Sequence, residues 1–335
     1  MPEGPTLAEL GEGELIRRLG AFASPGQFDD DAALLPAGLP QAQLVINTDV
    51  LVEEVHFSEA TTGPGDVGWR AAAANLSDLA AMGCSRVVGL TVGLVAPGGT
   101  PWRWVEGVYQ GMAEVLEVHG GVLLGGDCSG GTQTVLAVTA LGLLPSVGGG
   151  PIRRRDGRAG DVLVSTGPHG LSRLGLALLK QDQTLPPLPP ELRARAVAAH
   201  LRPVPRLDVV QALAQSLPLD HAWRVGGCDS SDGLVAAVVA VAAASGCGAV
   251  LERDRLPLEP AMASFPQGVD WCLSGGEDFE LVLALAPAWA ERLVERLPGA
   301  APIGALVEAA GPELLHWAGS GEPLRSGADA FRHFR

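Results

Sequence analysis

Lysine is nearly absent from this chain of 335 residues, since Lys180 is the only lysine among its 23 basic residues. Lys180 follows two leucines rather than a glycine-rich loop, so the G-x-x-x-x-G-K phosphate-binding motif is excluded. A single lysine in this setting also disfavours an enzyme that works through a lysine Schiff base.

Paired metal-binding and nucleophilic motifs are also lacking. The five cysteines are widely scattered without a C-x-x-C pair, and the seven histidines are dispersed, which disfavours zinc and disulfides and favours reduced thiols in the cytoplasm. The absence of G-x-S-x-G disfavours a serine hydrolase. No apolar run is long enough to span a membrane and no signal-like N-terminus is present, so we expect no membrane partner.

Positive charge is scarce overall. The formal net charge is -15, which argues against a nucleic-acid partner. Any ligand that carries phosphate would need local cations, from metal or protein, to overcome this field. The length suffices for two domains, and residues 145–158, rich in glycine and arginine, are the best linker. We therefore expect domains at 1–149 and 150–335.

Apolar periodicity predicts helices and strands that alternate along the chain. We expect helices at 7–19, 69–82, 102–119, 171–179 and 234–244. We expect strands at 44–46, 86–95, 122–124, 134–144, 162–165 and 279–285. The first half should then hold a sheet of about four strands, with 44–46 ending just before Asn47, Thr48 and Asp49.

Carboxylates gather where folding alone gives little reason for them. Asp29-Asp30-Asp31 precedes an apolar run, and Asn47-Thr48-Asp49 follows the next predicted strand. Adjacent carboxylates repel one another by several kcal/mol for a close pair, even at an effective dielectric of about 20. Oxygen ligands of this kind suit Mg²⁺ held together with substrate phosphates. A solvated acidic loop is the alternative interpretation.

Three later stretches again join glycine to carboxylate, at 125–127, 226–233 and 275–278. We expect a turn at each, where glycine lets the backbone approach a ligand closely. In the second stretch, Ser231 or Asp232 could instead cap the predicted helix 234–244, which leaves Asp229 unexplained. On the helix 69–82, Asn75 and Asp78 are three residues apart and share a face.

These pieces indicate phosphoryl transfer. That chemistry needs metal ions that neutralise phosphates and a geometry that aligns donor and acceptor, with little covalent chemistry from the protein. The candidate carboxylates lie at predicted turns or helices of both halves: Asp30, Asp31, Asp49, Asp78, Asp127, Asp229 and Asp232.

Seven motifs in order resemble the thiamine-monophosphate kinase family, over essentially the whole chain. They are Asp30-Asp31-Ala32, 47–49 with His56-Phe57, 75–83, Gly125-Gly126-Asp127, His200-Leu201-Arg202-Pro203, 229–234 and 274–278. The family is similar to the wider group of aminoimidazole-ribonucleotide-synthetase-like ATP-binding proteins.

The resemblance implies an α/β (α+β) fold of two domains. The N-terminal mixed sheet would carry helices on one face and pair in a homodimer, and the C-terminal domain would be an α/β sandwich. The implied reaction is direct, Mg²⁺-assisted transfer of the γ-phosphate of ATP to thiamine monophosphate, the last step of thiamine diphosphate synthesis, by a cytoplasmic enzyme.

The resemblance also implies roles for individual residues. The metal ligands would be Asp31, Asn47, Thr48, Asp49, Asp78, Asp127, Asp229 and Asp232, of which Asp49, Asp127 and Asp232 are the catalytic core. Contacts to ATP would come from Tyr109, Gly126, Asp127, Arg154 and Ser231. His56, Glu277 and Phe331 would hold the thiamine moiety, where an anion and an aromatic face suit a cationic ring.

The chain departs from the family pattern at two positions. Asp29 stands where the family usually has glycine, and Asn47 where serine is commoner. The resemblance leaves open which of the three aspartates binds metal and which arginine of 153–155 meets ATP. The alternatives are another ATP-using member of the superfamily, such as selenophosphate synthetase or the hydrogenase maturation carbamoyl-dehydrating protein, or a non-catalytic thiamine-phosphate-binding protein. The first would carry a reactive cysteine and a lysine near its N-terminus and the second a C-terminal cysteine, and neither feature is present.

Overall fold

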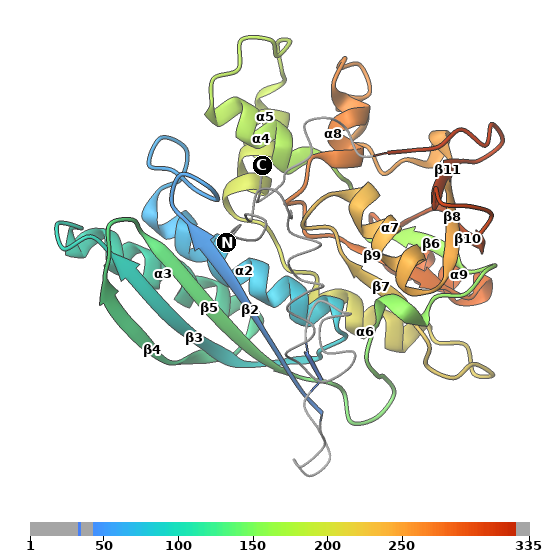
Figure 1. Ribbon diagram of the computed structural model, residues 1–335, viewed down its shortest axis with the longest axis horizontal. Coiled ribbons are helices and arrows are strands. Elements are labelled where there is room, and N and C mark those ends of the chain that lie inside the picture. The colour runs from blue at the N-terminus through green and yellow to red at the C-terminus, as the bar shows by residue number, and fades with distance from the viewer. Residues whose placement is uncertain (1–32, 35–42, 326–335) are drawn as a thin grey trace, which may run out of the picture.

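The computed structural model describes residues 33–34 and 43–325, which form two mixed α/β halves, each built on its own sheet (Figure 1). The predicted helix at 7–19, the aspartates 29–31 and Phe331 lie outside the described residues. Within the described part, none of the helices is both long and apolar enough to cross a membrane.

The first half is a five-stranded sheet backed by two helices. Its strands are β1 (Ala33–Leu34), β2 (Leu44–Val52), β3 (Arg86–Ala96), β4 (Val122–Gly130) and β5 (Val135–Leu143), in the order β1-β2-β5-β3-β4. Only the β3–β4 pair is parallel. The helices α2 (Pro64–Ala81) and α3 (Trp102–His119) lie on one face of the sheet (Figure 1). Strand β5 alternates buried and half-buried residues, as expected when only one face is covered.

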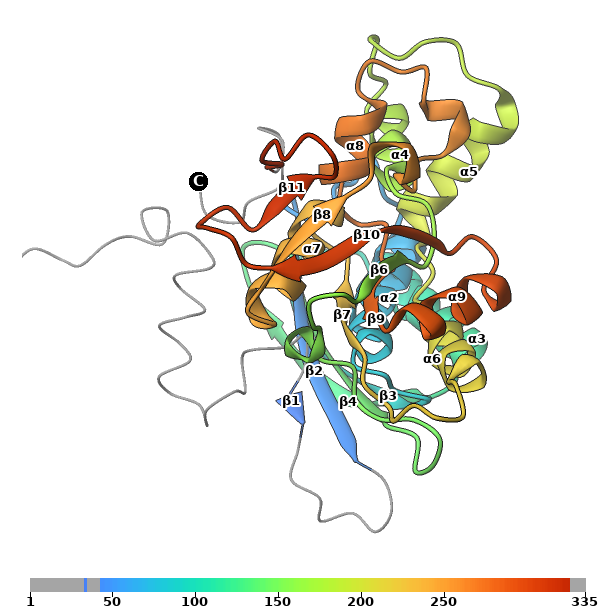
Figure 2. The same cartoon turned by 90° about the vertical axis from the view of Figure 1, so that its right-hand side faces the viewer.

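The second half is a six-stranded sheet between two helical layers. Its strands are β6 (Val162–Ser165), β7 (Gly226–Asp229), β8 (Cys247–Leu251), β9 (Leu281–Leu285), β10 (Ala301–Glu308) and β11 (Leu315–Trp317), in the order β11-β8-β10-β6-β9-β7. The helices are α4 (Leu171–Leu179), α5 (Pro190–Leu201), α6 (Leu207–Ser216), α7 (Leu234–Ala244), α8 (Gly268–Ser274) and α9 (Pro287–Arg296). Helix α7 packs on one face of the sheet, and α6 and α9 pack on the other (Figure 2). Strand β9 is buried throughout, which a central strand of a sandwich requires.

Six of the predicted elements have different bounds in the structure. Helix α2 spans Pro64–Ala81 rather than 69–82, β3 ends at Ala96 rather than Val95, and β5 spans Val135–Leu143 rather than 134–144. Strand β2 runs to Val52, so Asn47, Thr48 and Asp49 lie within the strand and not after it. Strand β4 continues through Gly125-Gly126-Asp127, where the sequence predicted a turn. Strand β9 begins at Leu281 rather than Phe279. With β1, the first sheet has five strands and not four.

Helices α2 and α3 cross at glycines, with backbone against backbone. A Cβ atom on Gly68 would lie 1.8 Å from the Val108 carbonyl oxygen, and one on Gly111 would lie 1.8 Å from the Gly65 carbonyl oxygen. Only glycine permits this approach, which holds α2 close to α3 and to the sheet.

Helix α2 also fastens the first half to the turn between α5 and α6. The Trp69 indole donates a hydrogen bond to the Pro203 carbonyl oxygen (2.8 Å), and the Arg202 guanidinium lies 5.1 Å from the centre of the Trp69 ring. Arg202 also forms ion pairs with Asp66 (2.7 Å) and Glu114 (2.8 Å) of the first half. The motif at 200–203 therefore has a structural role at the boundary between the halves.

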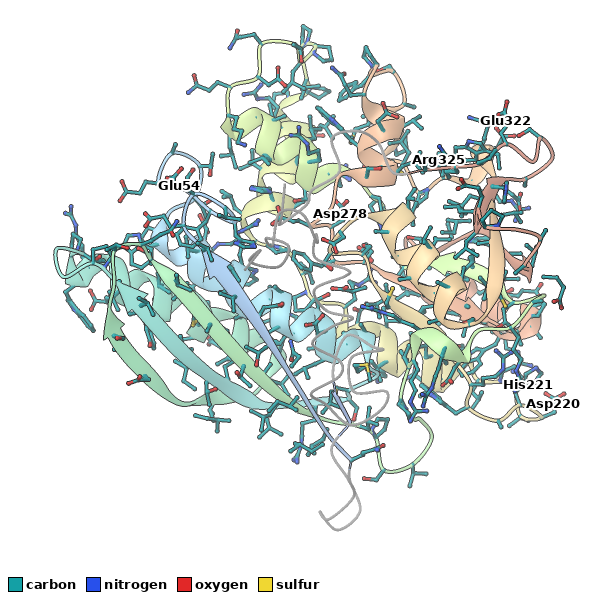
Figure 3. The ribbon with its side chains drawn as sticks, viewed as in Figure 1. Glu54, Asp220, His221, Asp278, Glu322 and Arg325 are labelled. Atoms are coloured by element: carbon teal, nitrogen blue, oxygen red, sulfur yellow. The ribbon has the colours of Figure 1, made fainter. Side chains whose placement is uncertain are left out.

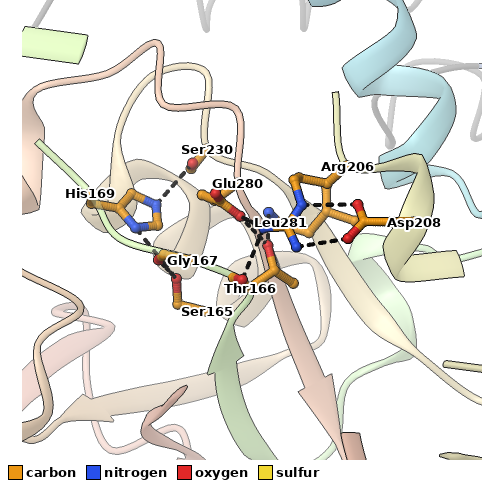
Figure 4. Close-up of polar contacts among 9 residues, drawn as sticks. All are labelled: Ser165, Thr166, Gly167, His169, Arg206, Asp208, Ser230, Glu280 and Leu281. Atoms are coloured by element: carbon orange, nitrogen blue, oxygen red, sulfur yellow. Dashed lines mark hydrogen bonds and ion pairs between the residues drawn. The ribbon is translucent and has the colours of Figure 1, made fainter. Parts of the chain in front are cut away.

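A buried polar network holds the ends of β6, β7 and β9 together (Figure 4). Ser165 donates to the Gly167 carbonyl oxygen, so it accepts from Nδ1–H of His169 (3.3 Å), whose Nε2 then accepts from Ser230 (2.9 Å). Beside it, Glu280 accepts from Thr166 (2.6 Å) and from Arg206. This network fixes the turn that follows Asp229.

The glycine contact predicts a selective effect of Gly68→Ala. The new methyl group would push α2 away from Val108, and we expect the free energy of unfolding to fall by about 1–3 kcal/mol. Gly65→Ala is the matched control in the same helix, because its Cβ atom would meet nothing closer than 3.8 Å. Denaturant unfolding that affects both variants equally would contradict this account of the crossing.

The buried histidine predicts a loss of stability in acid. Burial lowers the pKa of His169 to about 4, from an unfolded value near 6.5. Between pH 6.5 and 4, the unfolded chain binds a proton at His169 that the folded chain does not bind. The free energy of unfolding should therefore fall by about 3 kcal/mol as the pH is lowered from 6.5 to 4.

Denaturant unfolding of wild type and His169→Gln from pH 7 to 4 measures this loss. The variant should show the shallower decline of the two. Parallel curves for wild type and His169→Gln would refute the assignment.

Candidate functional site

A cavity of about 950 Å³ lies between the two halves. Its walls come from β2 and the loop after it, α2, α4, the end of α5 and the loops 229–232 and 275–279. In Figure 3, Glu54 marks the loop after β2, and Asp278 marks the loop 275–279 of the second half. Most of the predicted polar residues line this cavity: Asp49, His56, Asp78, Asp229, Ser231, Asp232 and Glu277.

Strand β2 and helix α2 build one wall through a compact polar cluster. The Asn47 amide donates to the side chains of Asn75 (3.1 Å) and Asp78 (2.7 Å), and Asn75 also accepts from the Asp49 backbone N–H (3.2 Å). Asn47 is only 7% exposed, and its Oδ1 atom has no hydrogen-bond partner among the described residues. A buried acceptor without a donor is costly in a native fold, unless a cation or water supplies the missing contact.

The turn after β7 supplies the opposite wall. Asp229 is 5% exposed and accepts hydrogen bonds from Ser77 of α2 (2.7 Å) and from Ser231 (3.1 Å). Burial raises the pKa of the Asp229 carboxyl, whereas these hydrogen bonds and the Arg154 charge act in the opposite direction. The Ser77 contact joins the two halves at the cavity.

The same turn decides between two interpretations of its polar residues. Helix α7 has Gly233 at its N-cap position and no side-chain capping bond. The alternative in which Ser231 or Asp232 caps this helix is therefore wrong. Both residues line the cavity instead.

The arginines at 153–155 have distinct surroundings. Arg153 pairs with Asp156 (3.6 Å), and Arg155 is exposed. Arg154 alone is near enough to Asp229 to act on its pKa. Of the three arginines, Arg154 is therefore the nearest to the acidic turn after β7, although it is not among the residues that line the cavity.

The donor set fits Mg²⁺ better than a metal bound by protein groups alone. Within residues 43–325, no three His, Cys, Asp or Glu side chains meet closely enough to hold an ion by themselves. Mg²⁺ is commonly bound by one or two carboxylates together with substrate phosphates. Asp49 and Asp78 on one wall, and Asp229 and Asp232 on the other, offer hard oxygen atoms for such a shared site. Asn47 does not line the cavity, but it is bonded to Asp78 and its Oδ1 is a further oxygen beside this group.

The far end of the cavity is formed by His56 and the loop 275–279. His56 accepts the Val52 backbone N–H at Nδ1 (3.0 Å), so its ring is neutral and carries its proton on Nε2. Glu277 has a left-handed backbone (φ 58°), and its N–H donates to the Ser231 carbonyl oxygen (2.7 Å). Its carboxylate accepts from Arg70 of α2 (2.5 Å).

Asp278, next in this loop, anchors it to the start of α4. The Asp278 carboxylate accepts the backbone N–H groups of Gly170 (2.7 Å) and Ser172 (3.0 Å). Burial raises the pKa of Asp278 to about 7, against the effect of these two hydrogen bonds. The loop that carries Glu277 is thus fixed on both sides.

Several predicted residues do not line this cavity, and Asn47 and Arg154 are among them. The Thr48 hydroxyl lies on the other face of β2 and bonds to Thr139 (2.7 Å), because side chains alternate along a strand. Gly126 and Asp127 lie on β4, at the opposite edge of the sheet from β2. The strand register runs from Asp49 through Val138 and Val92 to Gly126. Three strand spacings therefore separate Asp49 from Gly126, a distance of about 14 Å. Tyr109 lies beside Cys128 of β4. The pKa of the Tyr109 hydroxyl is raised mainly by burial and also by the Cys128 thiol.

Three basic residues of the cavity escaped prediction: Arg70, Arg173 and Lys180. The sequence held one signal for Arg70, which is a lone charge directly before four alanines in an otherwise apolar helix segment. Nothing in the sequence indicates its partner, because Glu277 lies 207 positions away.

Comparison with known proteins agrees with this architecture. Residues 29–144 match the N-terminal domain of AIR synthase related proteins, and residues 158–316 match their C-terminal domain. The thiamine-monophosphate kinase of Prochlorococcus marinus is 45% identical over 98% of this chain and 97% of its own length. That of Synechococcus elongatus is 50% identical over 87% of each chain.

A solved structure of AaThiL complexed with AMPPCP and TMP superposes with a TM-score of 0.82 and 27% identity, over 99% of both chains. The sequence-based assignment of the family and of the two-part α/β fold is confirmed. The chain belongs to the thiamine-monophosphate kinase family.

Proposed function

We propose that this protein transfers the γ-phosphate of ATP to thiamine monophosphate, yielding thiamine diphosphate and ADP. The main support is its full-length similarity to AaThiL, which is complexed with the ATP analogue AMPPCP and with TMP. The cavity between the halves has room for both ligands and presents acidic groups from both sides. An oxygen of the acceptor phosphate attacks the γ-phosphorus while its bond to the β-phosphate oxygen breaks, so no covalent enzyme intermediate is needed.

The acidic walls of the cavity would hold Mg²⁺. The ion would neutralise phosphate oxygens and align donor with acceptor. Asn47, Asp49 and Asp78 would hold it from the first half, and Asp229 and Asp232 from the second. The hydrogen bonds from Ser77 and Ser231 fix the orientation of the Asp229 carboxylate, and Ser231 and Arg154 would contact the phosphates of ATP.

The thiamine moiety would bind at the opposite end of the cavity, in contact with His56 and Glu277 and with Phe331 as the third residue. A neutral His56 offers its Nε2–H as a donor, and Glu277 offers a carboxylate oxygen. Arg70 already offsets much of the negative charge of Glu277, because the two form an ion pair. Glu277 would therefore recognise hydrogen-bond donors of the thiamine rings as much as the positive charge of the thiazolium.

We also propose a homodimer in which the N-terminal sheets pair. Strand β4 is an edge strand that is exposed along its whole length, with Val122 58% and Leu124 47% exposed. Monomeric proteins rarely leave a long apolar edge uncovered. Gly126 and Asp127 lie on this strand, so any role of theirs in nucleotide binding would belong to the dimer interface.

The domain division at 149/150 and a cytoplasmic location belong to the same proposal. The first domain would bind ATP and Mg²⁺ and dimerise, and the second would complete the nucleotide and substrate site. All five cysteines lie in the described part of the chain, where none forms a disulfide and four are buried, as suits a reducing compartment. The acidic net charge supports the absence of a nucleic-acid partner.

Incubation with ATP, Mg²⁺ and thiamine monophosphate tests the reaction. Thiamine diphosphate and ADP should form in equal amounts with sequential kinetics, and Asp49→Asn should lower turnover about 100-fold or more because it removes a charge that the metal needs. Asp220→Asn, an equal charge change at the outer edge of the second half (Figure 3), is the control. Absence of thiamine diphosphate would overturn the function, and near-normal turnover of Asp49→Asn at saturating Mg²⁺ would overturn the metal assignment.

Sedimentation equilibrium tests the dimer. Wild type should have twice the chain mass of 34.4 kDa, and Leu124→Lys should shift it toward the monomer, because a charge in an apolar interface must be desolvated. Leu219→Lys, at a fully exposed position of the second half, should remain dimeric. A monomeric wild type at micromolar concentration would rule out the pairing.

A further inference from the structure

Arg70 is the most deeply buried charge of the cavity wall. It lies on α2, is 4% exposed, and reaches into the second half of the chain. Its Nη1 donates to the His200 carbonyl oxygen at the end of α5, and its Nη2 donates to Glu277 Oε1 (2.5 Å). One side chain of the first half therefore fixes two segments of the second.

Stability gives only a weak reason for this arrangement. A buried ion pair costs about as much in desolvation as it returns, and apolar residues often serve as well. In addition, the Nε atom of Arg70 is buried without an acceptor among the described residues. A fold keeps such unfavourable groups mainly where they serve a function.

The surroundings of Glu277 indicate what that function is. Glu277 has a positive φ of 58°, which a residue with a side chain adopts only when its neighbours hold it there. Its backbone is held by Ser231 and its carboxylate by Arg70, while the side chain remains 36% exposed at the cavity. The second oxygen, Oε2, lies 3.6 Å from Nδ1 of His200.

His200 does not compete for this carboxylate as a cation. Burial first, and then the charge of Arg70, lower the pKa of His200 to about 4, so the ring is neutral near pH 7. Its Nδ1 also lies 3.1 Å from the Ser172 hydroxyl. Arg70 is thus the cation that orients Glu277.

We infer that Arg70 is a positioning residue for the acceptor substrate, which acts by holding the Glu277 carboxylate at the cavity wall. This inference rests on the proposed function. Arg70 sets the direction of the one carboxylate oxygen left for the ring system, and it does so from α2, the helix that also carries Asn75, Ser77 and Asp78 of the metal end. Acceptor binding and the acidic walls are therefore built on the same rigid element.

Steady-state kinetics of Arg70→Met and Arg70→Lys test the inference. Both variants should raise KM for thiamine monophosphate, Arg70→Met by about tenfold to hundredfold and Arg70→Lys by less, with KM for ATP nearly unchanged. Arg195→Met, which breaks an ion pair with the buried Glu259 outside the cavity, is the matched control and should leave both KM values unchanged. A purely structural role would lower the unfolding midpoint of Arg70→Met without separating the two substrates.

A double-mutant cycle with Glu277→Gln decides whether Arg70 acts through Glu277. In the Glu277→Gln background, Arg70→Met should change KM for thiamine monophosphate by less than about twofold. Effects that multiply would overturn the inference while leaving the proposed reaction intact. If Arg70→Met does not fold, the same cycle is run with Arg70→Lys. A wild type that does not use thiamine monophosphate would overturn the proposed function first, and the role of Arg70 with it.

Discussion

Helix α2 is enclosed on nearly every side, and the arrangement of the cavity depends on this burial. Twelve of its 18 residues are buried, because the first sheet and α3 cover it on one side and β7 and α6 on the other. A polar side chain on such a helix must find a partner or lose its hydrogen bonds. Asn75 and Asp78 find theirs in β2, and Arg70 and Ser77 find theirs in the second half. The polar groups at the cavity are therefore positioned by the hydrogen bonds and ion pairs that the buried side chains of α2 require.

Charge is distributed unevenly along this cavity, in a protein that is strongly acidic overall. The aspartates gather where β2 meets the turn after β7, whereas Arg70, Arg173 and Lys180 lie on the walls around His200. A ligand with phosphates at one end and a ring system at the other therefore meets different surroundings at its two ends. Only the acidic end needs a bound metal ion to offset its negative charge, because arginine and lysine side chains already supply positive charge at the other end.

Local pattern was enough for elements whose neighbours do not alter their bounds. The sequence predicted α3, α4, α7 and β6 with the ends that the structure has, since each is an apolar or amphipathic run closed by glycine, proline or polar residues. It misjudged β2 and β4, where polar or glycine residues continue a strand because a neighbouring strand pairs with them. Nine residues of β5 pair with β2, and no local signal reports that partner. Asp49, Asp78, Asp229 and Glu277, which the motifs singled out, line one cavity, whereas the Arg70–Glu277 pair joins residues too distant in sequence to be foreseen.

The glycine crossing of α2 and α3 bears on how ligands enter and leave. Where two backbones touch without side chains between them, there is no layer in which one helix can slide over the other. The two helices and the sheet behind them therefore behave as one rigid unit. A change in the width of the cavity would have to break the contacts that α2 makes with the second half, which are Ser77–Asp229, Arg70–Glu277 and Trp69–Pro203. The contacts that position the cavity residues are thus also the contacts that hold the two halves together.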